Sequence, residues 1–182
     1  MRRKFLTGAE VKHLLDFISN NKFSKRDYCM VKMAFLHGLR VSELISLKLD
    51  DYDPFSRKLY IHRLKGGLNT SHPLFPDEYA SLDLWLKERE LNTGASLPWI
   101  FLTQQGKKMS RQRFYQIIKY YGALADISVS IYPHMLRHAC GYGLAERGND
   151  TRIIQDYLGH RNIRHTVIYT TTNADRFQKI WD

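Results

Sequence analysis

Apolar residues at helical spacing recur along the chain, and most of these runs follow a capping residue and end at a glycine or a turn. The first run follows the string TGAE, in which Thr7 and Glu10 can satisfy each other's backbone donors as a capping box. Its apolar positions are Val11, Leu14, Leu15 and Ile18. An amphipathic segment must bury one face against another element, so the pattern predicts a helical assembly around a core.

Further helices are expected at several places along the chain. They are predicted from Ser24 through MAFL, at 42 to 47, at 77 to 90, from Ser110 through RQRFYQIIKYYG, and in three segments after Pro133. The stretch from 58 to 74, KLYIHRLKGGLNTSHPL, has two extended runs around a Gly-Gly turn, which predicts a hairpin with Lys65 at its mouth. The expected fold class is mixed α/β, mainly helical with a small antiparallel sheet.

The length and charge narrow the class of protein. A chain of 182 residues with 43% hydrophobic content fits one domain, predicted to span residues 1–182. The 28 Lys and Arg against 18 Asp and Glu give a net charge of +10. A surface this basic attracts polyanions, of which DNA and RNA are the commonest.

The compartment is expected to be reducing. Cys29 and Cys140 are the only cysteines and have no disulfide-framework or zinc spacing. The start MRRK is not followed by the apolar region of a signal peptide, and no apolar run approaches membrane-spanning length. We expect a cytoplasmic protein with no membrane partner.

Five basic residues stand at expected helix ends or at the hairpin mouth: Arg40, Lys65, His134, Arg137 and His160. On a helix, His134 and Arg137 share a face because they are three positions apart. Two guanidiniums that fork onto nonbridging oxygens, with histidine and lysine donors, would form a cradle for a phosphate. Tyr169 is then the available nucleophile, since no serine or cysteine with a paired base belongs to this set.

These residues lie in the strings HGLRVSEL, RLKGG, HMLRH, LGH and VIY. In order and spacing, from about Phe5 to Trp181, the strings resemble the motifs of the tyrosine site-specific recombinases, also called the phage-integrase family. The longer strings YPHMLRHACGY and DTRIIQDYLGHRNIRHTVIYT most resemble the short fimbrial phase-switch invertases of that family. The resemblance implies a fold like the tyrosine recombinase catalytic domain.

The resemblance also implies a role for each site residue. Tyr169 would attack a DNA phosphodiester to form a 3′-phosphotyrosine, while Arg40 and Arg137 hold the nonbridging oxygens. His134 would accept or steer the tyrosine proton, Lys65 would protonate the leaving 5′-oxygen, and His160 would hydrogen-bond the phosphate. Glu43 would orient the site as a supporting carboxylate. One phosphate ester replaces another, so no metal, ATP or other cofactor is expected.

The implied function is DNA inversion of a promoter-bearing segment, which switches fimbrial expression. The implied partners are double-stranded DNA with inverted-repeat sites, further copies of the chain in a tetramer, and accessory DNA-bending proteins, in association with the nucleoid. Members of the family commonly carry a separate N-terminal DNA-clamping domain. Arg40 stands so early here that no such domain is expected. Residues 175–182 are expected to bind a neighbouring subunit, the alternative being that they fold back onto the core of their own chain.

Several other residues receive interpretations from their context. Contacts with DNA are predicted for Lys107, Lys108, Arg111, Arg113 and Lys119. His138 and His165 are interpreted as packing or phosphate-side residues, and Tyr120 and Tyr121 as core and rim aromatics.

Two rival functions share some of these features. A DNA-binding transcriptional regulator without catalysis would explain the charge, with RQRFYQIIKYYG as a major-groove helix. A metal enzyme could use His134 with His138, or Asp50, Asp51 and Asp53. The arginine between the two histidines would repel a cation, and DDYDP is better interpreted as a turn.

Overall fold

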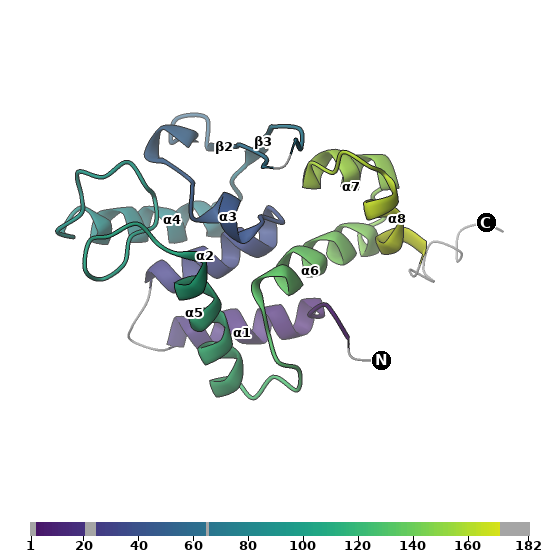
Figure 1. The fold of residues 1–182 in the computed structure, drawn as a ribbon, viewed down its shortest axis with the longest axis horizontal. Coiled ribbons are helices and arrows are strands. Elements are labelled where there is room, and N and C mark those ends of the chain that lie inside the picture. The colour runs from purple at the N-terminus through teal and green to yellow at the C-terminus, as the bar shows by residue number, and fades with distance from the viewer. Residues whose placement is uncertain (1–2, 21–24, 65, 172–182) are drawn as a thin grey trace.

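A computed structural model describes residues 3–20, 25–64 and 66–171. In chain order the elements are α1 (Gly8–Asn20), α2 (Lys25–Leu36), α3 (Val41–Leu44), the 3₁₀ turn η1 (Leu49–Asp51), β1 (Tyr52–Asp53), β2 (Lys58–Ile61), β3 (Thr70–Pro73), α4 (Pro76–Arg89), α5 (Arg111–Leu124), α6 (Pro133–Glu146), α7 (Thr151–Leu158) and α8 (Arg164–Thr171). The predicted class, mainly helical with a small antiparallel sheet, is confirmed (Figure 1).

Helix α2 occupies the centre of the helical layer and contacts α1, α3, α4 and α6. Its buried residues are distributed around most of the helix circumference, as expected for a helix that other elements cover on several sides. The core runs from Leu14 of α1 through Met30 of α2 to Leu136 of α6, all fully buried. Burial on this scale holds the two ends of α2 in place, including the turn that leads to Arg40.

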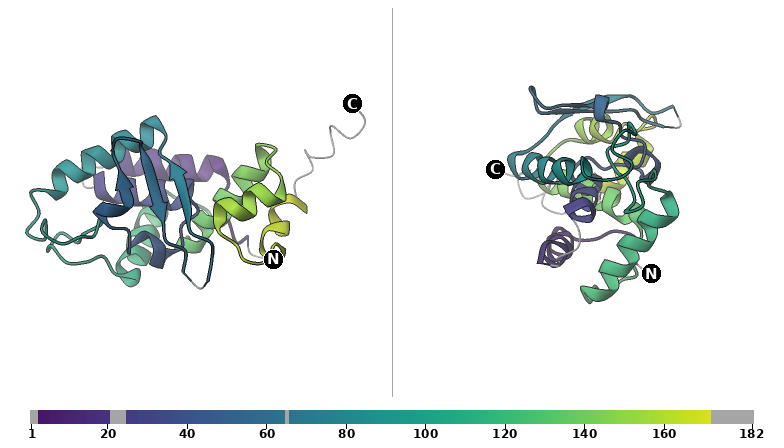
Figure 2. Two further views of the ribbon diagram at one scale, coloured as in Figure 1. Left: turned by 90° about the horizontal axis from the view of Figure 1, so that it is seen from above. Right: turned by 90° about the vertical axis from the view of Figure 1, so that its left-hand side faces the viewer.

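The sheet is antiparallel with strand order β1-β2-β3 and lies as a separate layer over the helices (Figure 2). Leu59 and Ile61 of β2 face inward while Lys58 and Tyr60 face solvent. This alternation continues beyond the strand, so that Arg63 is buried and its neighbours His62 and Leu64 are exposed. The hairpin therefore turns an arginine, rather than an apolar side chain, toward the helices.

Local signals explain where the helices begin. The backbone N–H of Glu10 donates to Oγ1 of Thr7 at 3.2 Å, and that of Thr7 donates to the Glu10 carboxylate at 2.8 Å, which confirms the predicted capping box. Ser110 caps α5 and Asp150 caps α7. The string DDYDP ends η1, forms β1 and begins the turn that follows this strand, in which Asp53 accepts from the backbone N–H groups of Phe55 and Ser56.

Candidate active site

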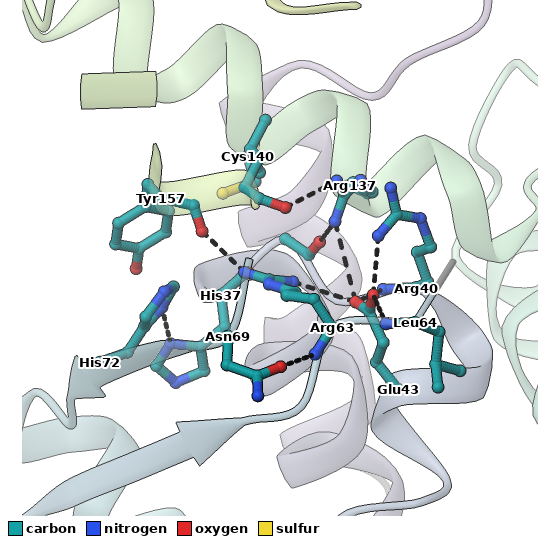
Figure 3. Close-up of polar contacts among 12 residues, drawn as sticks. His37, Arg40, Glu43, Arg63, Leu64, Asn69, His72, Arg137, Cys140 and Tyr157 are labelled. Atoms are coloured by element: carbon teal, nitrogen blue, oxygen red, sulfur yellow. Dashed lines mark hydrogen bonds and ion pairs between the residues drawn. The ribbon is translucent and has the colours of Figure 1, made fainter. Parts of the chain in front are cut away.

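The carboxylate of Glu43 is the point at which the elements of the site meet. Glu43 is 2% exposed and lies in the first turn of α3. Its Oε1 accepts from Nη1 of Arg40 at 2.7 Å, and its Oε2 accepts from Nη1 of Arg63 at 3.0 Å (Figure 3). The backbone N–H of Leu64 donates to Oε1 at 3.3 Å. Burial alone would raise the pKa of Glu43, but the opposing effects of Arg63 and Arg40 outweigh burial and lower the pKa below its usual value. The carboxylate is therefore ionised.

Arg137 of α6 is held by the backbone of two turns. Its Nη1 donates to the carbonyl of Gly38 at 2.5 Å and its Nη2 to that of Leu158 at 2.8 Å. The residue is 1% exposed, and burial together with Arg40 lowers its pKa to about 10. It is therefore charged at neutral pH. A guanidinium has five N–H donors, so donors remain for a ligand after both carbonyls are bound.

Arg40 is the more open of the two predicted phosphate ligands. Its side chain is 28% exposed, whereas those of Arg63 and Glu43 are 0% exposed. With Arg137 included, three guanidiniums surround the one carboxylate of Glu43, so the net charge of the cluster is 3 − 1 = +2. An uncompensated positive charge in a desolvated site favours the binding of an anion. Arg40, as the partly exposed member of the cluster, is the group that an anion from solvent can contact.

Tyr169 lies on α8 with a side chain that is 2% exposed. Its hydroxyl is 3.0 Å from Nδ1 of His138, and its ring lies edge-on to that of Tyr142. A Cβ added to Gly141 would lie 2.6 Å from two carbons of the ring, so the bare face of this glycine makes room for the tyrosine. Burial raises the pKa of Tyr169 to about 12, against a smaller opposing effect of Arg137.

Of the two histidines of HMLRH, only His138 is in hydrogen-bond contact with the tyrosine in this structure, and the role of His134 stays a prediction. His138 contacts the hydroxyl of Tyr169, while His134 is exposed and its ring lies edge-on to that of His138 at 4.6 Å between centroids. Burial and His134 lower the pKa of His138 to about 4, so its imidazole is neutral at pH 7. The interpretation of His138 as a packing or phosphate-side residue did not include this contact. The signal was its position one turn after His134 on the same face.

His160 lies directly after Gly159, which ends α7 in a left-handed conformation with φ of 64°. Its Nδ1 is 2.9 Å from Oγ1 of Thr166, and its ring is stacked with that of Tyr169 at 6.4 Å between centroids. Burial and the nearby Arg137 lower the pKa of His160 to about 3. The structure thus brings His160 next to the tyrosine, and its contact with a phosphate stays a prediction.

Lys65 lies outside the described residues. The residues on either side of it are held against the site, because Leu64 donates to Glu43 and a Cβ at Gly67 would lie 2.8 Å from the carbonyl oxygen of Gly159. The loop between β2 and β3 thereby meets both the Glu43 cluster and the turn that carries His160. The role of Lys65 remains a prediction.

The residues predicted to contact DNA are all exposed: Lys107, Lys108, Arg111, Arg113 and Lys119. Lys108 lies over the ring of Trp99, with its Nζ 3.5 Å from the ring centroid. The last three belong to α5, which lies well apart from α8 (Figure 1). Their contact with DNA is not tested by this arrangement and stays a prediction.

Within the described part of the chain, none of the helices combines the length and the apolar character that crossing a membrane requires.

The chain is similar to proteins of one family over nearly its whole length. Residues 4–176 match the model of the phage integrase family. The chain is 49% identical over 181 residues to the type 1 fimbriae regulatory protein FimB of Escherichia coli (strain K12), covering 100% of this chain and 90% of the relative. It is 47% identical over 182 residues to FimE of the same strain, covering 100% and 92%.

A solved structure confirms the fold. The crystal structure of the XerH site-specific recombinase bound to a palindromic difH substrate, a post-cleavage complex, has a TM-score of 0.83 to this chain at 24% identity. The match covers 97% of this chain and 53% of XerH. The helices and the sheet thus follow the arrangement of a recombinase catalytic domain. The chain belongs to the phage integrase family and is a tyrosine recombinase.

Proposed function

We propose that this chain cleaves and rejoins DNA at specific sites through a covalent link between Tyr169 and a 3′-phosphate. The observation that carries the proposal is the convergence of Arg40, Arg137 and His160 with a tyrosine whose hydroxyl contacts a neutral imidazole, that of His138. Such a set provides an anion clamp, a nucleophile and a proton acceptor in one place.

The reaction is balanced without a cofactor. The phenolic oxygen of Tyr169 forms a bond to phosphorus, and the bond from phosphorus to the 5′-oxygen breaks. Lys65 gives a proton to the leaving 5′-oxygen, and the phenolic proton passes to the histidine pair, of which His138 is the member in contact. Arg40 and Arg137 bind the nonbridging oxygens, and His160 donates to the phosphate. Attack by a released 5′-hydroxyl reverses the steps and rejoins the strand.

The resting arrangement also indicates what DNA must change. A phenol with a pKa of about 12 beside an imidazole with a pKa of about 4 keeps its proton. Besides burial and His134, the positive charge of Arg137 depresses the pKa of His138. A bound phosphate would oppose that charge and so favour transfer of the phenolic proton to the imidazole. Tyr169 must also turn out of its buried position to reach a phosphorus atom, so we propose that DNA binding and exposure of the tyrosine are coupled.

The test is covalent trapping on a nicked site. Wild-type protein should give a protein–DNA adduct that survives a denaturing gel, and Tyr169→Phe should bind the same DNA without an adduct. Tyr120→Phe, at an exposed position of α5, is the matched control and should retain the adduct. An adduct formed by Tyr169→Phe would contradict the assignment.

The proposed biological reaction is inversion of a promoter-bearing segment that controls fimbrial expression. The support is the identity of 49% and 47% to two type 1 fimbriae regulatory proteins over the full chain. A reporter segment between inverted repeats should change orientation with the wild-type protein and stay fixed with Tyr169→Phe. A non-catalytic regulator would alter transcription equally well with either protein, and this alternative is not favoured.

We further propose that four copies act together on paired sites with the help of DNA-bending proteins, in association with the nucleoid. Exchange of two duplexes breaks four strands, and each strand needs its own Tyr169. The apolar residues Phe177, Ile180 and Trp181 would couple the copies, although they lie outside the described residues. Removal of residues 175–182 should leave binding to one half-site and abolish the larger complex on native gels. Unchanged assembly would contradict this role.

A further inference from the structure

Arg63 is a buried arginine that begins the string RLKGG, in which the sequence motifs pointed to Lys65 and not to Arg63. It follows β2 at an inward position of the strand alternation, and its side chain is 0% exposed. An arginine is rarely buried to this degree without specific partners, because its charge is costly to remove from water. Its surroundings therefore indicate what it does.

The guanidinium of Arg63 connects three parts of the site (Figure 3). Its Nη1 donates to Oε2 of Glu43 at 3.0 Å. Its Nη2 donates to the carbonyl of His37 at 3.3 Å and to that of Tyr157 at 2.7 Å. One side chain from the hairpin thus binds the end of α2, the beginning of α3 and the end of α7.

Arg137 binds the next carbonyl along each of the same two turns, those of Gly38 and Leu158. The two arginines therefore hold successive carbonyls of both turns. One turn leads to Arg40 and the other to His160. The relative position of these two phosphate ligands depends on how the turns are held together.

The aliphatic stem of Arg63 lies between two glycines. A Cβ at Gly159 would lie 2.8 Å from Cγ of Arg63, and a Cβ at Gly67 would lie 2.9 Å from its Cβ. Both glycines belong to motif strings. Gly159 directly precedes His160 in LGH, and Gly67 follows Lys65 by two positions in RLKGG. The close approach of the hairpin to the α7 turn therefore requires both glycines and places the Arg63 stem between them.

Retention of this guanidinium is not explained by stability alone. Its Nε has no hydrogen-bond partner within the described residues, and burial lowers its pKa despite the neighbouring Glu43. Buried ion pairs of this kind can often be replaced by apolar groups of similar volume without loss of stability, whereas a fork of three directed bonds defines a geometry that apolar packing does not.

We propose that Arg63 is a positioning residue for strand cleavage, which holds the Arg40 turn and the His160 turn in register around Glu43 so that both ligands meet one phosphate. The inference rests on the proposed function. Arg63 touches no reacting atom in this role. It acts through Glu43 and the carbonyls of His37 and Tyr157.

The experiment compares cleavage of two nicked substrates by purified full-length variants. One substrate has an ordinary phosphate at the cleaved position, and the other has an uncharged methylphosphonate there, which demands less of a cationic clamp. Arg63→Met keeps a stem of similar length and removes the fork. A misplacement near 1 Å lowers rates by about 10²-fold, so we expect a loss of about that size on phosphate and a clearly smaller loss on methylphosphonate. Arg63→Lys keeps the charge without the fork and should fall between wild type and Arg63→Met.

Arg89 provides a matched control. It is 3% exposed and donates to the carbonyls of Trp99, Ala95 and Leu97, all outside the site. Arg89→Met should lose stability in urea but keep the wild-type ratio of the two cleavage rates per folded molecule. An equal loss on both substrates for Arg63→Met would show that Arg63 only supports the fold, and unchanged cleavage would also overturn the proposal. If Arg63→Met does not fold, the same ratio is measured for Arg63→Lys. Absence of any adduct with the wild-type protein would instead contradict the proposed function.

Discussion

The phenolic oxygen of Tyr169 lies 3.0 Å from Nδ1 of His138, and this contact belongs to a residue that is 2% exposed and is the proposed nucleophile. In the tautomer protonated at Nε2, Nδ1 of the imidazole accepts a hydrogen bond from the phenolic O–H. The contact therefore combines two properties. It satisfies a buried hydroxyl in the DNA-free chain, and it places a proton acceptor at the oxygen that would attack DNA.

Loss of this bond should be measurable by a double-mutant cycle. His138→Ala leaves the buried hydroxyl unpaired, so we expect the free energy of unfolding to fall by about 1–3 kcal/mol, with slower adduct formation. In a Tyr169→Phe background the same substitution should cost less, because the bond is already absent. Urea denaturation of the four proteins gives the coupling. An equal cost in both backgrounds would show that the bond contributes no stability.

Gly141 and Gly143 offer a matched pair on α6. A Cβ at Gly141 would meet the Tyr169 ring at 2.6 Å, whereas a Cβ at Gly143 would lie 3.1 Å from the Arg147 side chain, which can move aside. Overpacking typically costs about 1–3 kcal/mol, so Gly141→Ala should be destabilised and should form less adduct. Gly143→Ala should be neutral, or more stable by up to about 1 kcal/mol through helix propensity. Thermal denaturation and trapping compare the two, and similar behaviour would argue against the packing of Tyr169 on Gly141.

Lys65 is expected to protonate the leaving 5′-oxygen. Lys65→Ala should therefore slow cleavage of ordinary DNA, by about 10²–10⁴-fold for the loss of a general acid. A 5′-bridging phosphorothioate leaves as a thiolate and needs no proton, so its cleavage should be largely preserved. Single-turnover rates on both substrates make the comparison, and an equal loss on the two would assign another role to Lys65.

Arg111 and Arg113 begin α5 as exposed residues and are expected to contact DNA phosphates. Neutralising either one should weaken binding, and the slope of log affinity against log salt should become shallower by about one unit for each lost contact. Filter-binding titrations at several salt concentrations measure the slope. Lys87→Gln on α4, where Lys87 pairs with Asp83, is the control and should keep both values. If Arg113→Gln behaves like this control, α5 lies off the DNA.

Stability should decline on acidification because buried histidines are held neutral. Burial lowers the pKa of His72 to about 2, of His160 to about 3 and of His138 to about 4, from 6.5. Below pH 6.5 the unfolded chain binds protons that the folded chain does not, so the stabilisation is complete above that pH and is lost as the pH falls toward the folded values. The urea midpoint should be lower at pH 5.5 than at pH 7.5, and His72→Phe should reduce the difference. A constant midpoint would contradict the shifts.

The sequence by itself determined the helices, the hairpin and the order of the motifs. These features depend on local physical effects: the capping box at Thr7 and Glu10, the serine cap of α5 and the apolar spacing of each helix act within a few residues of one another. The candidate ligands Arg40 and Arg137 could be named because their motifs carry the types of residue that a phosphate clamp needs.

Only the tertiary structure decided which groups touch. His134 and His138 lie on one face of α6, and the position of α8 determines that the second one meets Tyr169. Arg63 stands at an inward position that alternation alone would assign to an apolar residue, and its partners come from turns 26 and 94 residues away in the chain. Contacts between such distant segments depend on how helices and sheet pack, and no local pattern of spacing records that packing.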